Sequence, residues 1–83
     1  MNTIPLSIIY QGMLLKGYAA SVESFHDFTP STLLVYIQGW YIGTLSFKDG
    51  KWSMDKPIDP AFVEQLGKYI HLTIQKVRSA MRV

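Results

Sequence analysis

The sequence predicts an α+β fold: an antiparallel meander of four to five strands, followed by one long C-terminal amphipathic helix packed on one face of the sheet. Between residues 4 and 55, three turn signals separate short apolar segments that are typical of strands. Between residues 57 and 83, apolar residues recur instead at helical spacing. We therefore expect a single domain over residues 1–83, with the sheet in residues 1–55 and the helix in residues 57–83.

Composition narrows the classes of protein to which the chain can belong. Of its 83 residues, 48% are hydrophobic and only 17% are charged, the opposite of the balance found in disordered chains. There is no cysteine, which excludes disulfides and thiolate metal sites and favours a reducing compartment. The first 16 residues do not form a signal peptide, and the longest apolar run, Leu33 to Ile37, cannot span a membrane. We expect a cytoplasmic protein without a membrane partner.

Three glycine-containing turns divide the strand region. Gln11-Gly12 and Gln38-Gly39 lie within similar apolar surroundings, and each predicts a hairpin because glycine accepts the positive φ that tight turns require. A bulge within one longer strand is the alternative for these two. Asp49-Gly50 is the strongest hairpin signal in the chain. The polar segment Ser21 to Ser31 is expected to be a surface loop.

Two-residue turns and unbroken alternation predict which side chains share a face of the sheet. The face assigned to the helix carries Leu34, Tyr36, Tyr41, Leu45, Phe47, Trp52 and Met54. The opposite face carries Leu33, Val35, Ile37, Trp40 and Ile42. A sheet with one wet side would alternate apolar and polar residues, whereas this hairpin is apolar on both sides. The second face therefore needs a cover of its own.

The predicted helix begins at a standard N-terminal signal. Asp59 is a good N-cap, and Pro60 follows at the first helical position, where its missing N–H costs nothing. About 20 residues follow, with one apolar stripe about 120° wide. The stripe consists of Phe62, Val63, Leu66, Ile70, Thr73, Ile74, Val77, Ala80 and Met81. A single stripe covers a single sheet face.

No residues stand out as catalytic, cofactor-binding or metal-ligating. His26 lies beside Asp27, but neighbouring side chains seldom point at each other and no nucleophile is identified nearby. His71 is expected on the polar side of the helix. No glycine pattern for binding phosphate occurs. We therefore do not expect an enzyme or a bound cofactor.

The uncovered face instead predicts self-association. A chain too short for a second helix most simply covers an apolar face with another copy of itself, across a two-fold axis. The expected contact residues are Leu33, Val35, Ile37, Trp40 and Ile42, with Tyr69 and Leu72 as a possible extension. In the alternative that stays open, the first hairpin folds across this face as a partial second layer. A small-ligand pocket is a third option.

Binding of single-stranded nucleic acid is the alternative function. Trp40, Lys48 and Lys51 fall on one predicted sheet face, and single-strand binders combine basic grooves with aromatic platforms. Against this, lysines beside a turn are common on any surface. Five of the eleven aromatic residues are also assigned to the core: Tyr36, Tyr41, Phe47, Trp52 and, on the helix, Phe62. The favoured function is a non-enzymatic interaction module that forms a homodimer.

A spaced set of glycine, aromatic and aliphatic residues resembles small single-domain bacterial proteins of unknown function. The set comprises Tyr10-x-Gly12, Gly17-x-Ala19, Gly39-Trp40-x-Ile42-Gly43-x-Leu45, Asp49-Gly50-Lys51-Trp52 and Leu66-Gly67-x-x-Ile70. The resemblance covers most of the chain, but its motifs are turns and core positions that imply no chemistry. Several strands followed by one helix is also similar in order to Whirly-like and PUR-type single-strand-binding modules, which dimerise through such elements. This second likeness is an analogy at the level of the fold.

Overall fold

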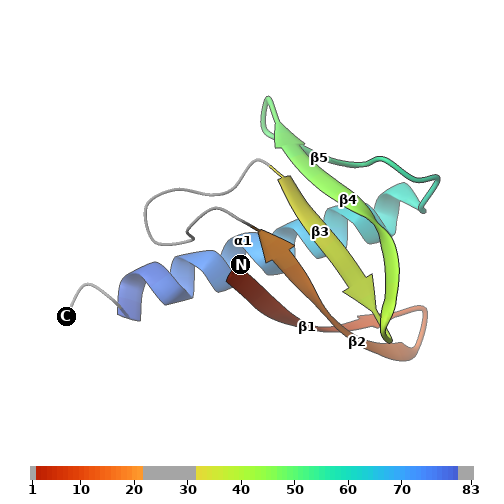
Figure 1. The fold of residues 1–83 in the computed structure, drawn as a ribbon, viewed down its shortest axis with the longest axis horizontal. Helices are drawn as coiled ribbons and strands as arrows, with labels where there is room; N and C mark the ends of the chain where they lie inside the picture. The colour runs from red at the N-terminus through yellow and green to blue at the C-terminus, as the bar shows by residue number, and fades with distance from the viewer. Residues whose placement is uncertain (1, 22–31, 81–83) are drawn as a thin grey trace.

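The computed structural model, which describes residues 2–21 and 32–80, is a five-stranded antiparallel sheet with one helix lying across one face (Figure 1). Neighbouring strands along the chain are also neighbours in the sheet, so the order is that of a simple meander. The predicted α+β fold is confirmed. The elements are β1 (Asn2–Tyr10), β2 (Met13–Ser21), β3 (Thr32–Ile37), β4 (Trp40–Lys48), β5 (Lys51–Met54) and α1 (Pro60–Ala80).

All three predicted hairpin turns are confirmed. In the first, Gln11 and Gly12 both have positive φ, at 51° and 79°, and the pairs Gln38–Gly39 and Asp49–Gly50 have closely similar values. Two consecutive positive φ angles define the type I′ turn, whose twist matches that of the flanking strands. The alternative of a bulge at the Gln-Gly pairs was wrong. The loop expected at residues 21–31 lies outside the described residues, except for Ser21, which ends β2.

A bulge does occur, but farther along β4. Tyr36 pairs with Tyr41, whereas the preceding residue of β3, Val35, pairs with Gly43, so Ile42 is an extra residue in the ladder. Gly43 has a φ of 150°, and a Cβ there would lie 2.7 Å from the sulfur of Met54. Glycine is the residue that tolerates both the angle and the close approach. Past this bulge, the side chains of β4 share a face with the residues of β3 that unbroken alternation places on the other side: Leu45 lies with Leu33, not with Leu34.

The bulge decides which face forms the core. Leu45 pairs with Leu33 and therefore lies on the face of Leu33, Val35 and Ile37, and this face packs against α1. The prediction that Leu45, Phe47, Trp52 and Met54 lie on the helix side is confirmed. The prediction that Leu34, Tyr36 and Tyr41 share that side was wrong, because it assumed alternation without interruption. The core consists of Ile4, Leu6, Ile8, Ala19, Leu33, Val35, Ile37, Leu45, Phe62, Val63, Leu66, Ile70 and Ile74, with Trp52 and Met54 packed against it.

The first hairpin extends the same sheet and does not form a second layer. Strand β2 pairs with β3 from Gly17 opposite Ile37 to Ala20 opposite Leu34, which makes β1 an edge strand. The alternative in which this hairpin folds across the sheet was wrong. The helix contacts both β1 and β5, the two edge strands, and so spans the width of the sheet (Figure 1).

The exposed edge of β1 is protected at two points. The two-residue turn makes Tyr10 and Met13 a hydrogen-bonded pair, so the backbone groups of the odd-numbered residues of β1 point away from β2. Pro5 is one of these residues, and its missing N–H therefore costs no ladder hydrogen bond. The carbonyl of Ile9 accepts a hydrogen bond of 2.8 Å from the Gln65 side chain. Both features leave fewer groups free for another strand to pair with.

The start of α1 is tied to the end of β1. Asp59 is the predicted N-cap: its carboxylate accepts the Ala61 N–H at 3.1 Å, and its second oxygen accepts a hydrogen bond from the Tyr10 hydroxyl. The Tyr10 ring also packs edge-on against Phe62, with centroids 4.8 Å apart. The hydrogen bond from Tyr10, followed by that from Ala61, lowers the pKa of Asp59. The helix begins at Pro60, the first helical position that the Asp59-Pro60 pair predicts within the region 57–83.

Candidate binding surfaces

The residues predicted for self-association do not form a surface. Leu33, Val35 and Ile37 are buried between the sheet and α1, because the bulge turns their face toward the helix. Ile42, the bulged residue, is half-buried and packs against the same core. Only Trp40, beside the β3–β4 turn, is strongly exposed, at 76%. The five residues are thus divided between the core and the tip of a hairpin.

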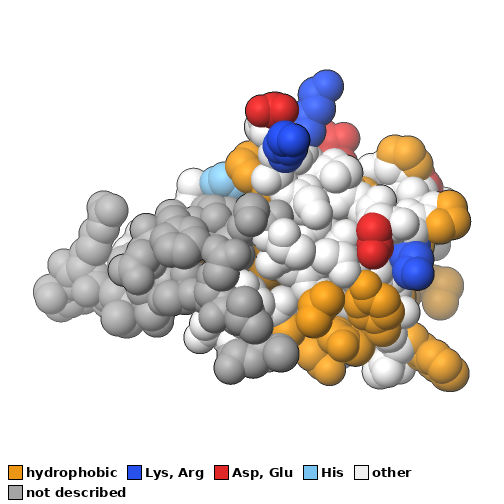
Figure 2. Space-filling model, turned by 45° about the horizontal axis from the view of Figure 1, so that its top comes forward, with side chains coloured by type: hydrophobic (Ala, Val, Ile, Leu, Met, Phe, Trp, Pro, Cys, Tyr) orange, Lys and Arg blue, Asp and Glu red, His pale blue; other side chains and the backbone are white. Residues whose placement is uncertain are grey.

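The apolar surface lies on the other side of the sheet. We call it the tyrosine face, and it consists of Ile9, Leu14, Tyr18, Tyr36 and Tyr41. Register places these side chains opposite α1, across four adjacent strands. Figure 2 shows a view in which hydrophobic side chains gather in one patch, with acidic and basic side chains at its margin. No described element covers the tyrosine face.

The three tyrosines form a row across β2, β3 and β4. The rings of Tyr18 and Tyr36 are stacked, with centroids 4.7 Å apart and planes 16° from parallel. The rings of Tyr36 and Tyr41 are 5.5 Å apart and tilted by 55°. The hydroxyls of Tyr41 and Thr44 form a hydrogen bond of 2.6 Å. Tyr36 therefore lies between two aromatic neighbours.

This packing decides what the row can recognise. An aromatic platform for nucleic acid needs ring faces that are free to stack on bases. Stacking between Tyr18 and Tyr36 occupies a ring face of each, and Tyr36 has an aromatic neighbour on its other side as well. The surface that Tyr18 and Tyr41 still expose, together with the tyrosine hydroxyl groups, is suited to packing against another protein surface.

The residues predicted to contact nucleic acid are not brought together. Trp40 begins β4 and Lys48 ends it, which places them about 26 Å apart at roughly 3.3 Å per residue. The bulge also puts them on opposite faces: Trp40 pairs with Ile37 on the helix side, whereas Lys48 and Lys51 lie on the side of the tyrosine face. They do not form one basic and aromatic surface.

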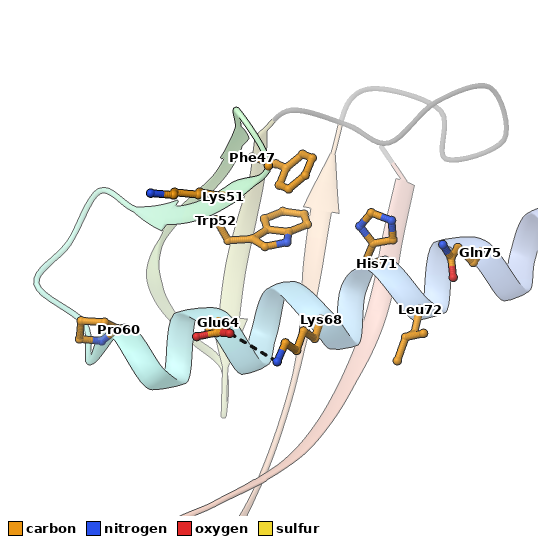
Figure 3. A pocket seen from close by; sticks show the side chains of 10 residues that line it. Phe47, Lys51, Trp52, Pro60, Glu64, Lys68, His71, Leu72 and Gln75 are labelled. Carbon is orange, nitrogen blue, oxygen red and sulfur yellow. Dashed lines mark ion pairs between the residues drawn. The ribbon is translucent and has the colours of Figure 1, made fainter.

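A second surface, which the sequence did not indicate, is a groove between the β4–β5 hairpin and α1 (Figure 3). Its volume is about 790 Å³. We call it the hairpin–helix groove, and it is lined by Phe47, Gly50, Lys51, Trp52, Pro60, Glu64, Lys68, His71, Leu72 and Gln75. Two features of the sequence could have indicated this groove. One is a glycine inside the helix, Gly67, and the other is a leucine on the polar side of the helix, Leu72.

Aromatic packing forms the inner wall of this groove. The rings of Phe47 and Trp52 are 4.6 Å apart and tilted by 40°, and His71 meets Phe47 edge-on at 6.1 Å. Trp52 lies against the backbone of Gly67, where even a methyl group would collide with the indole. The outer wall carries an exposed ion pair between Lys68 and Glu64, with nitrogen and oxygen 3.4 Å apart.

Two further kinds of site, for a metal ion and for a membrane, concern residues 2–21 and 32–80. This part of the chain holds no cluster of three or more histidine, cysteine, aspartate or glutamate residues placed to bind a metal ion. None of its helices has the length and apolar character needed to cross a membrane. The pair His26 and Asp27 lies outside the described residues.

A scan against protein-family models found no match, and comparisons with curated proteins and with solved structures found none either. The resemblance to small bacterial proteins of unknown function stays a prediction. What the protein does is therefore inferred from its two surfaces.

Proposed function

We propose that the protein is a non-enzymatic interaction module of the cytoplasm that forms a homodimer through the tyrosine face. The observation that carries this proposal is the apolar patch on the sheet face opposite α1 (Figure 2). An exposed apolar patch with a polar margin is characteristic of a protein interface. The proposal retains the homodimer expected from the sequence but assigns the contact to a different set of residues.

The chemistry of the patch suits a second copy of the same chain. A two-fold axis brings identical groups together, so a group at the axis must be able to pair with itself. A tyrosine hydroxyl is both donor and acceptor and meets this condition. Within the described part of the chain, the hydroxyls of Tyr18 and Tyr36 have no hydrogen-bond partner, unlike that of Tyr41.

The distribution of charge supports the same partner. Lys16 lies on this face between Leu14 and Tyr18 of β2, while Lys48 and Lys51 lie at the far end of the sheet, beside the β4–β5 turn. Packing two copies face to face therefore has to accommodate one lysine, whose flexible aliphatic stem lets the ammonium reach the solvent at the margin. An apolar centre with charges at the margin is the usual anatomy of an interface.

The size of the face is sufficient for a small stable interface. Four strands at a spacing of about 4.8 Å and a length of up to about 30 Å cover roughly 550 Å². Two such faces amount to about 1,100 Å², just above the roughly 1,000 Å² that specific interfaces require. Sheets also pack face to face at a separation of about 10 Å, which suits side chains the size of tyrosine.

Sedimentation equilibrium tests the proposal. The wild-type chain is expected to have twice the mass of one chain at micromolar concentration, and Tyr36→Lys is expected to be monomeric because it places two like charges at the axis. Trp40→Glu is the matched control: it adds a charge at the hairpin tip, on the helix side, and should remain a dimer. Thermal melting of each variant checks that it is folded.

Two results would contradict the proposal. One is a wild-type chain that is monomeric at high micromolar concentration. The other is saturable binding of a labelled single-stranded oligonucleotide that weakens with added salt and is abolished by Tyr36→Ala, which removes the ring without adding a charge. The second result would favour the nucleic-acid alternative and would show that the ring edges, or ring faces released by rearrangement, contact bases.

A further inference from the structure

The hairpin–helix groove lies on the helix side of the sheet and is separate from the tyrosine face. Its volume of about 790 Å³ falls within the range of roughly 300–1,000 Å³ that is typical of small-molecule sites. Such sites are mainly apolar and carry a few polar groups that orient the ligand. The groove has this composition, because aromatic residues line one wall and polar residues of α1 line the other (Figure 3).

The apolar part of the groove is built from both elements. Phe47 and Trp52 of the hairpin point toward α1, and His71 points back toward them (Figure 3). Leu72 lies farther along α1, on the same side as Lys68, and is 58% exposed although it is aliphatic. The core does not use Leu72, whereas an apolar ligand in the groove would cover it. The lining therefore suits a flat, apolar molecule.

The charged part of the groove favours an anion. Lys68, His71 and Gln75 follow one another at spacings of three and four residues, so they project from neighbouring positions on α1. Lysine, the ring N–H of histidine and a side-chain amide can all donate hydrogen bonds to a carboxylate. Lys51 also lines the groove, but its side chain leaves β5 on the side opposite Trp52 and points away from His71 (Figure 3), so Lys68 carries the positive charge of the site. The carboxylate of the lining, Glu64, is already paired with Lys68.

We propose that this groove binds a small aromatic carboxylate. The aromatic ring packs against Phe47 and Trp52, and the carboxylate approaches Lys68 and His71. Lys68 is available for this role because its pair with Glu64 is strongly exposed to solvent, and exposed ion pairs are weak. Lys68 thus exchanges a weak contact with the Glu64 carboxylate for one with the carboxylate of the ligand. The ligand covers apolar surface at the same time. Binding here does not depend on the oligomeric state of the protein.

Two naphthalene compounds of the same shape and opposite charge test the proposal. Naphthalene-2-carboxylate is the probe, and 2-naphthylmethylamine is the cationic control. In a Trp40→Phe background, Trp52 is the remaining tryptophan, so its fluorescence reports on the groove directly. We expect saturable quenching by the carboxylate, with an affinity at least tenfold higher than that of the amine. Amide chemical shifts should change at Phe47, Trp52 and His71 and remain unchanged on the tyrosine face.

Substitutions separate the charge of the site from its apolar part. Lys68→Met keeps the aliphatic stem and removes the charge, and should weaken carboxylate binding at least fivefold without weakening the amine. Leu72→Ser should weaken both compounds. Lys16→Met, which removes a lysine on the opposite side of the sheet, should change neither. Equal affinity for the two probes, an unaltered affinity in Lys68→Met, or no saturable binding at millimolar concentration would each overturn the proposal.

Discussion

The indole ring of Trp52 lies directly against the backbone of Gly67 in the middle of α1. A Cβ at residue 67 would be 2.3 Å from Cγ and Cδ1 of Trp52, closer than real Cβ atoms approach any other heavy atom. Glycine in a helix interior costs about 1 kcal/mol relative to alanine. The close contact is what offsets this cost, because it lets the short strand β5 pack on the helix.

Replacing Gly67 by alanine is therefore expected to destabilise the protein despite the gain in helix propensity. Displacing a half-buried indole by overpacking costs about 1–3 kcal/mol, more than the propensity returns. The measurement is the free energy of unfolding in urea. In a Trp52→Ala background the collision is gone, and Gly67→Ala should instead stabilise by up to about 1 kcal/mol. The same sign in both backgrounds would contradict this account.

The bulge at residues 42–43 should tolerate nothing larger than glycine. Gly43→Ala combines an unfavourable φ with contacts of 2.7 Å to the Met54 sulfur and 2.9 Å to an Asp55 carboxylate oxygen. That oxygen accepts the Thr44 N–H at 2.7 Å and so helps to hold the bulge. We expect a loss of about 2–4 kcal/mol in the free energy of unfolding.

Gly12 offers a matched control for this substitution. It also has a positive φ, but an added Cβ there would meet nothing within 4 Å. Gly12→Ala should therefore cost only the backbone term, about 1–2 kcal/mol. A larger loss for Gly12→Ala than for Gly43→Ala would mean that the bulge is not held by these contacts.

Two adjacent leucines report directly on which sheet face the helix covers. Leu33 is fully buried against α1, whereas Leu34 lies on the opposite side and is half-buried. Leu33→Ala should cost about 2–5 kcal/mol, as for other leucines truncated in a core, and Leu34→Ala about 1 kcal/mol. Urea unfolding measures both. A larger loss for Leu34→Ala than for Leu33→Ala would support the face assignment that unbroken alternation predicts.

The hydrogen bond between Tyr10 and Asp59 should make stability depend on pH at both ends of the scale. It lowers the pKa of Asp59 below its ordinary value of about 3.9. The stability that Asp59 contributes is therefore present above about pH 3.9 and is lost as the pH falls through the folded-state pKa. The same bond raises the pKa of Tyr10 above about 10. Its contribution is present below about pH 10 and is lost as the pH rises through the folded-state value.

Tyr10→Phe isolates this effect, since it removes the hydroxyl and keeps the ring against Phe62. Thermal melts of the wild type and the variant should differ most between about pH 4 and pH 10. The difference should shrink in acid, and again in strong alkali. A difference that is constant from pH 2 to pH 7 would show that the hydroxyl does not act through Asp59.

Local signals in the sequence were sufficient for the elements and their order. Two-residue glycine turns, the Asp59-Pro60 start and the apolar stripe of the helix each depend on a few neighbouring residues. The turns and the start were confirmed, and so was the part of the stripe from Phe62 to Ile74. These signals work because backbone φ preferences and capping hydrogen bonds are decided within a few residues. Neither surface could be placed in this way.

The faces of the sheet were decided only by the tertiary structure. One inserted residue, Ile42, reverses the alternation in β4, and whether a strand accommodates such an insertion depends on how its neighbours pack. Gly43 indicated where a bulge could lie, but the pattern of alternating residues did not show that the bulge would change which face of the sheet packs against the helix. The proximity of Trp52 to Gly67 likewise depends on the path of the chain between them. By itself, the sequence determined that one helix leaves one apolar sheet face uncovered, and the bulge decided that this face is the one with the tyrosines.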